Sequence, residues 1–120
     1  MKRVPECFRR HRRALEIIAA NPQKFIGDID SSVKPALEIP LPERGRILTE
    51  TDIRLIMANG DIHIIEYKSN SNYTYRKRAK RQLEKARGWY RRNMGFTPEQ
   101  IHTHVIFGDD PRYSEFFREL

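Results

Sequence analysis

The chain has 120 residues, of which 38% are hydrophobic and 32% are charged, a balance typical of a folded domain with one hydrophobic core. Its 23 Lys and Arg against 16 Asp and Glu give a formal net charge of +7, which favours an anionic partner, above all nucleic acid. The single cysteine excludes an intramolecular disulfide and any Cys-rich zinc site. Because the sequence contains neither a long apolar run nor a signal-peptide pattern, we expect a soluble, intracellular, cytoplasmic domain over residues 1–120 that does not engage membranes.

In chain order, the spacing of apolar and turn-forming residues predicts a helix, an edge strand, two hairpin strands, a long helix, a fourth strand and a terminal helix. The expected bounds are 6–20, 35–41, 51–57, 61–69, 73–93, 101–107 and 112–120. The first helix should end before Asn21-Pro22, and the long one at Gly95. Pro40 and Pro42 should end the edge strand, because proline suits an edge and not a central strand.

The Asn59-Gly60 turn between the two hairpin strands decides which side chains face one another. A two-residue loop would place Asp52 opposite Tyr67 and send Asp52 and Glu66 to opposite faces of the sheet. A three-residue loop with Gly60 in the left-handed region would place Asp52 opposite Glu66 instead. We predict the second register, because glycine stands where a positive φ is needed. The same register puts Glu50 opposite Lys68.

Two carboxylates directly across a ladder repel each other by up to ~1 kcal/mol, so the predicted pair needs a compensating charge. Mg²⁺ is a hard cation that takes one or two carboxylates and leaves positions for water and phosphate oxygens. Lys68 lies on the same strand face as Glu66, since side chains repeat every two residues. Its ammonium group can therefore reach an oxygen bound at the metal.

Asp52, followed after a hairpin by Glu66-Tyr67-Lys68, resembles the motif of the PD-(D/E)XK nuclease superfamily. One position differs, because this chain has Thr51 where the superfamily usually has proline. The resemblance implies a restriction-endonuclease-like α/β fold with an αβββαβ core and a mixed central sheet flanked by helices. It also implies Mg²⁺-dependent hydrolysis of DNA phosphodiester bonds, with Mn²⁺ substituting. Asp52 and Glu66 would bind the metal, the Tyr67 carbonyl would add a ligand, and Lys68 would activate or orient the attacking water.

Two further residues are assigned by the same resemblance. Gln82 lies within the apolar stripe of the long helix and corresponds to an amide that contacts the active site or substrate phosphate in many relatives; a bond to nearby backbone is the alternative. Glu16 resembles an acidic metal ligand from the first helix, although Arg12 could pair with it instead. Glu6 and Glu50 are alternatives to Glu16.

The long helix also carries a dense set of cations, with only Glu84 as an acidic neighbour. Such a face repels itself unless phosphate neutralises it, so we predict that it binds DNA. The residues proposed for this contact are Arg76, Arg78, Lys80, Arg81 and Lys85. His102 and His104 share one face of the fourth strand and are expected to be residues of the sheet surface.

Two functions follow from these patterns. The first is a metal-dependent deoxyribonuclease of the endonuclease type, with an exonuclease still open. Because the chain holds little besides the catalytic core, a homodimer or a larger assembly is open as the form that recognises the substrate. The second is a DNA-binding protein that retains the nuclease fold without its activity. The form of DNA that is recognised is open in both cases.

Overall fold

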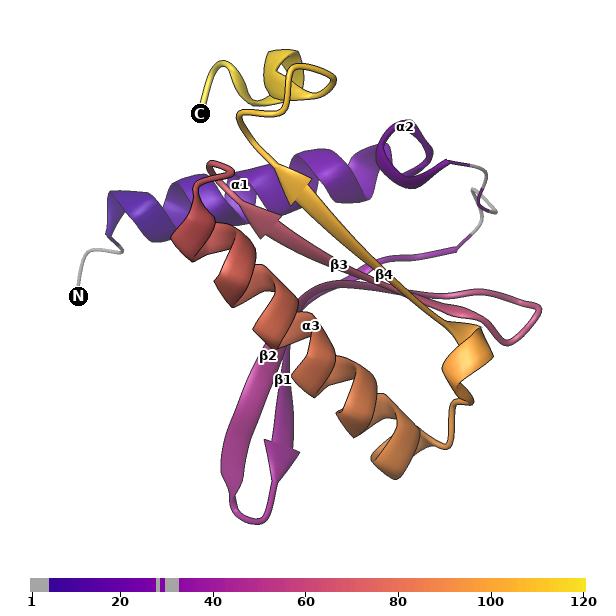
Figure 1. Cartoon of the computed structure of the whole chain (residues 1–120). Helices are drawn as coiled ribbons and strands as arrows, with labels where there is room; N and C mark the ends of the chain where they lie inside the picture. The colour runs from indigo at the N-terminus through magenta and orange to yellow at the C-terminus, as the bar shows by residue number, and fades with distance from the viewer. Residues whose placement is uncertain (1–4, 28, 30–32) are drawn as a thin grey trace.

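The computed structural model describes residues 5–27, 29 and 33–120, which form a four-stranded mixed sheet with helices on both faces (Figure 1). The helices are α1 (Glu6–Ala20), α2 (Gln23–Ile26) and α3 (Tyr73–Met94). The strands are β1 (Ala36–Glu43), β2 (Arg46–Ile56), β3 (Ile62–Lys68) and β4 (Ile101–Phe107). Two 3₁₀ turns, η1 (Pro98–Gln100) and η2 (Ser114–Phe117), flank β4. The predicted αβββαβ order and mixed sheet are confirmed; the short helix α2 was not predicted.

The sheet order is β1-β2-β3-β4, with antiparallel pairing throughout except between β3 and β4, which are parallel. A long helix joins the two parallel strands, as a parallel connection requires. Successive side chains of β3 point to opposite faces: Ile65 and Tyr67 pack with α1, whereas Ile62 and Ile64 pack with α3. Two hydrophobic clusters therefore hold the sheet between α1 and α3.

The turn between β2 and β3 has the predicted three-residue form. The Met57 amide donates to the Asp61 carbonyl at 2.8 Å, and the Gly60 amide donates to the Met57 carbonyl at 3.0 Å. Gly60 has a φ of +94°, in the left-handed region that favours glycine. The paired residues run from Ile56↔Ile62 to Ile53↔Ile65, so Asp52 and Glu66 come next in the same register.

The predicted end of the edge strand was wrong. β1 continues through both prolines to Glu43, because an edge strand needs hydrogen-bond donors on one side only, and a bulge between Leu41 and Pro42 absorbs the irregularity. β2 correspondingly begins at Arg46, five residues before the predicted start. A second hairpin, with the turn Arg44-Gly45, was therefore missed.

The predicted terminal helix was also wrong, because only the short turn η2 forms within residues 112–120. So short a segment gains little from its own helical hydrogen bonds, and tertiary packing decides its conformation. Tyr113, Phe116 and Phe117 all lie against the ring of Phe25, with ring centroids 5.0–5.8 Å apart. No described helix has the length and apolar character needed to cross a membrane.

Candidate active site

The sheet divides into two pairs of strands next to Asp52 and Glu66. Pairing between β2 and β3 ends at Ile53↔Ile65, although both strands continue. Beyond that point β2 stays paired with β1 as far as Arg46, and β3 stays paired with β4 as far as Lys68. Figure 1 shows the β1–β2 hairpin turning away from β3 and β4. We call the open angle between the two pairs of strands the fork. Backbone groups that would bond across a continuous ladder are free there to bind side chains or a ligand.

Asp52 lies at the fork and is held from two sides. Its Oδ2 accepts a hydrogen bond from the Tyr67 amide at 2.8 Å. In a continuous ladder this amide would instead donate to a backbone carbonyl of β2. Its Oδ1 is 3.2 Å from Nε2 of His11, which comes from α1. Only 4% of Asp52 is exposed. The two contacts therefore hold its carboxylate in a nearly buried site, where hydrogen bonds are electrostatically stronger than in water.

Glu66 shares this position with Asp52. It is 2% exposed, and its carboxyl group lies close enough to that of Asp52 for their charges to interact. Burial, followed by the adjacent Asp52 charge, raises the pKa of Glu66 to about 9, although Lys68 acts in the opposite direction. In the metal-free protein at neutral pH the pair therefore holds one proton.

Lys68 lies beside Glu66. Its Nζ lies 3.8 Å from Glu66 Oε1, and its side chain is 16% exposed, so it reaches the boundary between the buried carboxyls and solvent. The predicted pairing of Glu50 with Lys68 does not form, because the ladder ends before these residues. Glu50 is exposed on β2. Partial loss of solvent around its carboxyl, followed by the Asp52 charge, raises its pKa.

The fork fits a divalent cation better than it fits two carboxylates alone. A cation between Asp52 and Glu66 would replace their shared proton and cancel the repulsion that raises the pKa of Glu66. The Tyr67 amide points into the fork toward Asp52, and in an extended strand the carbonyl of the same residue points to the same side. No group of three or more His, Cys, Asp or Glu side chains within the described ranges is arranged to hold a metal. The fit is thus to a cation such as Mg²⁺, which keeps most of its ligands as water or substrate oxygens.

The structure brings His11, and not Glu16, to the fork from α1. The Asp52 contact raises the pKa of His11, although burial opposes the shift. Glu16 is exposed and lies five residues further along, which corresponds to about 140° around the helix. Arg12 pairs with Glu38 at 3.0 Å, and not with Glu16.

A sequence signal for His11 was available. His11 precedes Ala14 and Leu15 by three and four residues, and both are fully buried. Residues at these spacings share one face of a helix, so His11 belongs to the stripe that packs on the sheet. A polar residue within such a stripe needs a partner, which here is Asp52.

Comparison of the sequence with protein-family models and with curated proteins finds no match. Two solved structures are similar. A repair endonuclease from Pyrococcus abyssi shares 13% identity and a TM-score of 0.53, over 99% of this chain and 46% of that one. The EndoMS protein in a complex with double-stranded DNA shares 18% identity and a TM-score of 0.52, over 77% of this chain and 33% of that one.

The chain has a restriction-endonuclease-like fold. The chain spans less than half the length of each of these two proteins. Within the restriction-endonuclease-like fold seen here, α3 packs on β2, β3 and β4 and therefore crosses the fork. Its side chains are the remaining candidates for contact with a substrate.

Gln82 lies on α3 beside the buried Leu83. Its Oε1 is buried and has no hydrogen-bond partner among the described residues. The alternative expectation was a Gln82 side chain bonded to a nearby backbone group, and Oε1 accepts no such bond from the described residues. A buried amide oxygen without a donor is costly, so this atom fits a contact to a water or a bound ligand.

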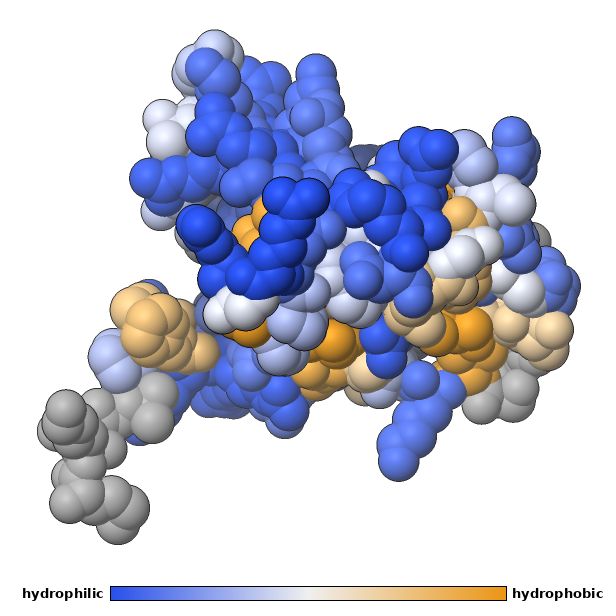
Figure 2. All heavy atoms as spheres, turned by 90° about the horizontal axis from the view of Figure 1, so that it is seen from below, coloured by the Kyte–Doolittle hydropathy of each residue, from blue (hydrophilic) through white to orange (hydrophobic). Residues whose placement is uncertain are grey.

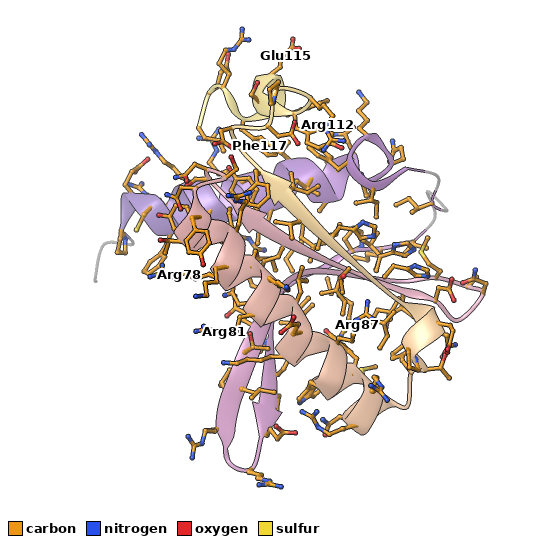
Figure 3. All side chains as sticks on the ribbon, in the orientation of Figure 1. Arg78, Arg81, Arg87, Arg112, Glu115 and Phe117 are labelled. Carbon is orange, nitrogen blue, oxygen red and sulfur yellow. The ribbon has the colours of Figure 1, made fainter. Side chains whose placement is uncertain are left out.

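The five α3 cations predicted to bind DNA are all exposed. None of them forms an ion pair with another described residue. Figure 3 shows Arg78 and Arg81 on one side of α3 and Arg87 on the other, toward β4, where its guanidinium donates to the Ile101 carbonyl at 3.3 Å. The side of α3 that carries Arg78 and Arg81 is therefore available to an anionic partner.

An open cleft of about 740 Å³ adjoins the fork. It lies between the N-terminal half of α1, the end of β3 and the C-terminal residues, and Tyr75 of α3 also lines it. His11, Tyr67 and Lys68 line the cleft as well as the fork. A substrate group in the cleft would consequently lie beside the carboxylate pair.

Proposed function

We propose that this chain is the catalytic domain of a metal-dependent DNA endonuclease. The observation that supports the proposal most strongly is the pair of nearly buried, adjacent carboxyls at the fork, with Lys68 at its edge. Asp52, Glu66 and the Tyr67 carbonyl would hold Mg²⁺, for which Mn²⁺ substitutes. His11 would position Asp52 through the 3.2 Å contact.

When bound, Mg²⁺ supplies Lewis-acid polarisation of the scissile phosphate and a lower pKa for a bound water. The chain supplies the remaining steps. Lys68 donates a hydrogen bond to the attacking water or to the phosphoryl oxygen on which negative charge develops. The Tyr67 amide and His11 keep Asp52 oriented. Gln82 Oε1, which has no donor among the described residues, accepts a hydrogen bond from a water, while the amide N–H of the same side chain donates to a phosphate oxygen.

DNA is the proposed substrate because the exposed cations of α3 lie on the helix that crosses the fork. The similarity to EndoMS bound to double-stranded DNA supports the same partner. A single fork can cut one strand at a time. Simultaneous cleavage of both strands of a duplex would therefore require a second copy of this chain, and we expect a homodimer for such a reaction.

The test is a cleavage panel with nicked, flap, junction and linear DNA in the presence of Mg²⁺ or Mn²⁺. Cleavage of at least one substrate should disappear with EDTA and in Asp52→Asn, Glu66→Gln and Lys68→Ala. Glu115→Gln, at an exposed acid in η2, is the matched control and should cleave normally (Figure 3). Undiminished cleavage by Glu66→Gln would refute the proposal. Binding of DNA in EDTA, without cleavage of any substrate, would instead support an inactive DNA-binding protein with the nuclease fold.

A further inference from the structure

The β1–β2 hairpin extends beyond the body of the molecule and ends in a tight turn (Figure 1). Glu43 pairs with Arg46, so the turn consists of Arg44 and Gly45 alone. Both have positive φ, +52° and +81°, as a two-residue turn of type I′ requires. This turn geometry makes the tip compact and well defined.

Arginine is an unusual choice at the first position of this turn. Asn, Asp and Gly adopt a positive φ with less strain, and Arg44 forms no ion pair with another described residue. Arg44 and Arg46 are both exposed, and neighbouring Ile47 is 57% exposed. The tip thus presents two cations and an apolar side chain to solvent.

The two acidic residues of β1 are paired with cations of the helices and not with the tip. Glu43 pairs with Arg92 of α3 at 2.9 Å, and Glu38 pairs with Arg12 of α1 at 3.0 Å. Figure 2 looks onto this end of the molecule and shows mostly hydrophilic side chains, with smaller hydrophobic patches between them. The charge at the tip therefore favours a polyanion.

The hairpin is anchored and not free to swing. The Trp89 indole donates to the Pro42 carbonyl at 2.8 Å, and the guanidinium of Arg92 holds Glu43. Both anchoring residues belong to α3, the helix that carries the exposed cations. The tip consequently has a fixed position relative to α3 and to the fork.

The distance from the tip to the fork follows from strand geometry. Arg46 and Asp52 both lie on β2, and the bulge opposite Leu41 and Pro42 leaves Leu48 unpaired between them. The six residues from Arg46 to Asp52 span about 20 Å. B-form DNA rises about 3.4 Å per base pair, so this span corresponds to about six base pairs.

We propose that the tip formed by Arg44, Arg46 and Ile47 binds the sugar-phosphate backbone of duplex DNA about six base pairs from the scissile phosphate. This inference rests on the proposed function for the location of the scissile bond. It adds a second contact on a rigid arm, which selects substrates with a duplex of at least this length on one side of the cut. The arginines contact phosphates, and Ile47 lies against the sugars.

Binding in EDTA tests the contact without any need for catalysis. Fluorescence anisotropy with a 30-base-pair duplex is measured across a salt series for the double variant Arg44→Asn/Arg46→Gln. Loss of two phosphate contacts should reduce the slope of log K against log salt by about 1.8 and weaken binding roughly 10- to 100-fold near 0.1 M salt. Asn suits the left-handed turn position, and an unchanged unfolding temperature confirms that the hairpin is intact.

The matched control is Arg13→Gln/Arg118→Gln, which removes the same charge from exposed positions on α1 and the C-terminal segment. It should leave the salt slope within about 0.5 of the parent value. An equal effect of both double variants, or no effect of the hairpin variant, would overturn the inference.

A length series locates the contact relative to the cut. In Mg²⁺, shortening the duplex below about six base pairs on one side of the cleavage site should lower kcat/KM for the parent but not for the hairpin variant. Equal length dependence in both proteins would refute the proposed position. If no metal supports cleavage while the hairpin variant binds DNA more weakly, the proposed function fails and the hairpin contact stands.

Discussion

Replacing Glu66 with Gln should stabilise the metal-free protein while abolishing its response to metal. The pKa of Glu66 is about 9 in the folded chain and about 4.5 when solvated. Between these values the folded state binds one more proton than the unfolded state, so stability falls as the pH rises. Each pH unit between about 4.5 and 9 lowers the free energy of unfolding by about 1.4 kcal/mol. At pH 7, about 2.5 units above the solvated pKa, the loss is about 3 kcal/mol. Gln is neutral at every pH and similar in size, so it removes this cost.

The measurement is thermal unfolding followed by circular dichroism in EDTA, from about pH 4.5 to about pH 8. At neutral pH the Glu66→Gln variant should unfold about 10 °C higher than the parent, and the two should converge near pH 4.5. Adding millimolar Mg²⁺ should raise the unfolding temperature of the parent, because the ion binds the folded state, but not that of the variant.

Two results would refute this reasoning. Equal or lower stability of the variant at neutral pH would mean that Glu66 is ionised and already compensated in the metal-free protein. If the difference in unfolding temperature between parent and variant does not change with pH, packing and not protonation would account for it. Because both readouts are stabilities, they are independent of finding the right DNA substrate.

Two other predictions concern the parts of the fold that hold the site. Gly60→Ala should lower stability by about 1–2 kcal/mol in urea unfolding, because an L-residue is strained at a φ of +94°. Gly88→Ala in α3 has an ordinary φ, and its Cβ would displace only the flexible end of Arg92, 2.7 Å away, at the cost of a surface ion pair. It should therefore lower stability by less than about 1 kcal/mol, and an equal loss in both variants would contradict the argument. Burial, followed by the charge of neighbouring His63, lowers the pKa of His104 to about 4, against 6.5 when solvated. The unfolded chain therefore binds the extra proton, so this contribution is complete above about pH 6.5 and is lost toward pH 4. It amounts to about 1–2 kcal/mol after allowance for the partial exposure of the ring. His104→Gln should flatten acid unfolding in this range, and an unchanged acid profile would show that other groups control it.

Local signals predicted most of the secondary structure. α1 and β4 have the bounds expected from apolar spacing, and α3 ends at Gly95, whose φ is +73°. The turn at Gly60 allowed one register to be chosen over another, and that choice is confirmed. These features depend on residues within a few positions of one another, which is why the sequence is informative there.

The errors occur where distant contacts override local preference. β1 runs through its prolines because its outer edge needs no donors, and the Arg44-Gly45 turn was missed because Arg is a poor turn signal. The C-terminal segment follows the aromatic packing on Phe25 and not its helical spacing. In each case tertiary packing contributes more free energy than intrinsic propensity.

By itself, the sequence determined that Asp52 and Glu66 meet, because the positive φ available to Gly60 fixes the register and the period of two fixes the face. Only the tertiary structure decided the surroundings of this pair. The fork between β2 and β3 buries both carboxyls, and the packing of α1 brings in His11 while leaving Glu16 in solvent. The crossing of α3 leaves the Gln82 oxygen without a partner in the described part of the chain. Register depends on neighbours along the chain, whereas burial and pKa depend on elements packed from elsewhere in it, so the chemistry of the site emerges only once the chain is folded.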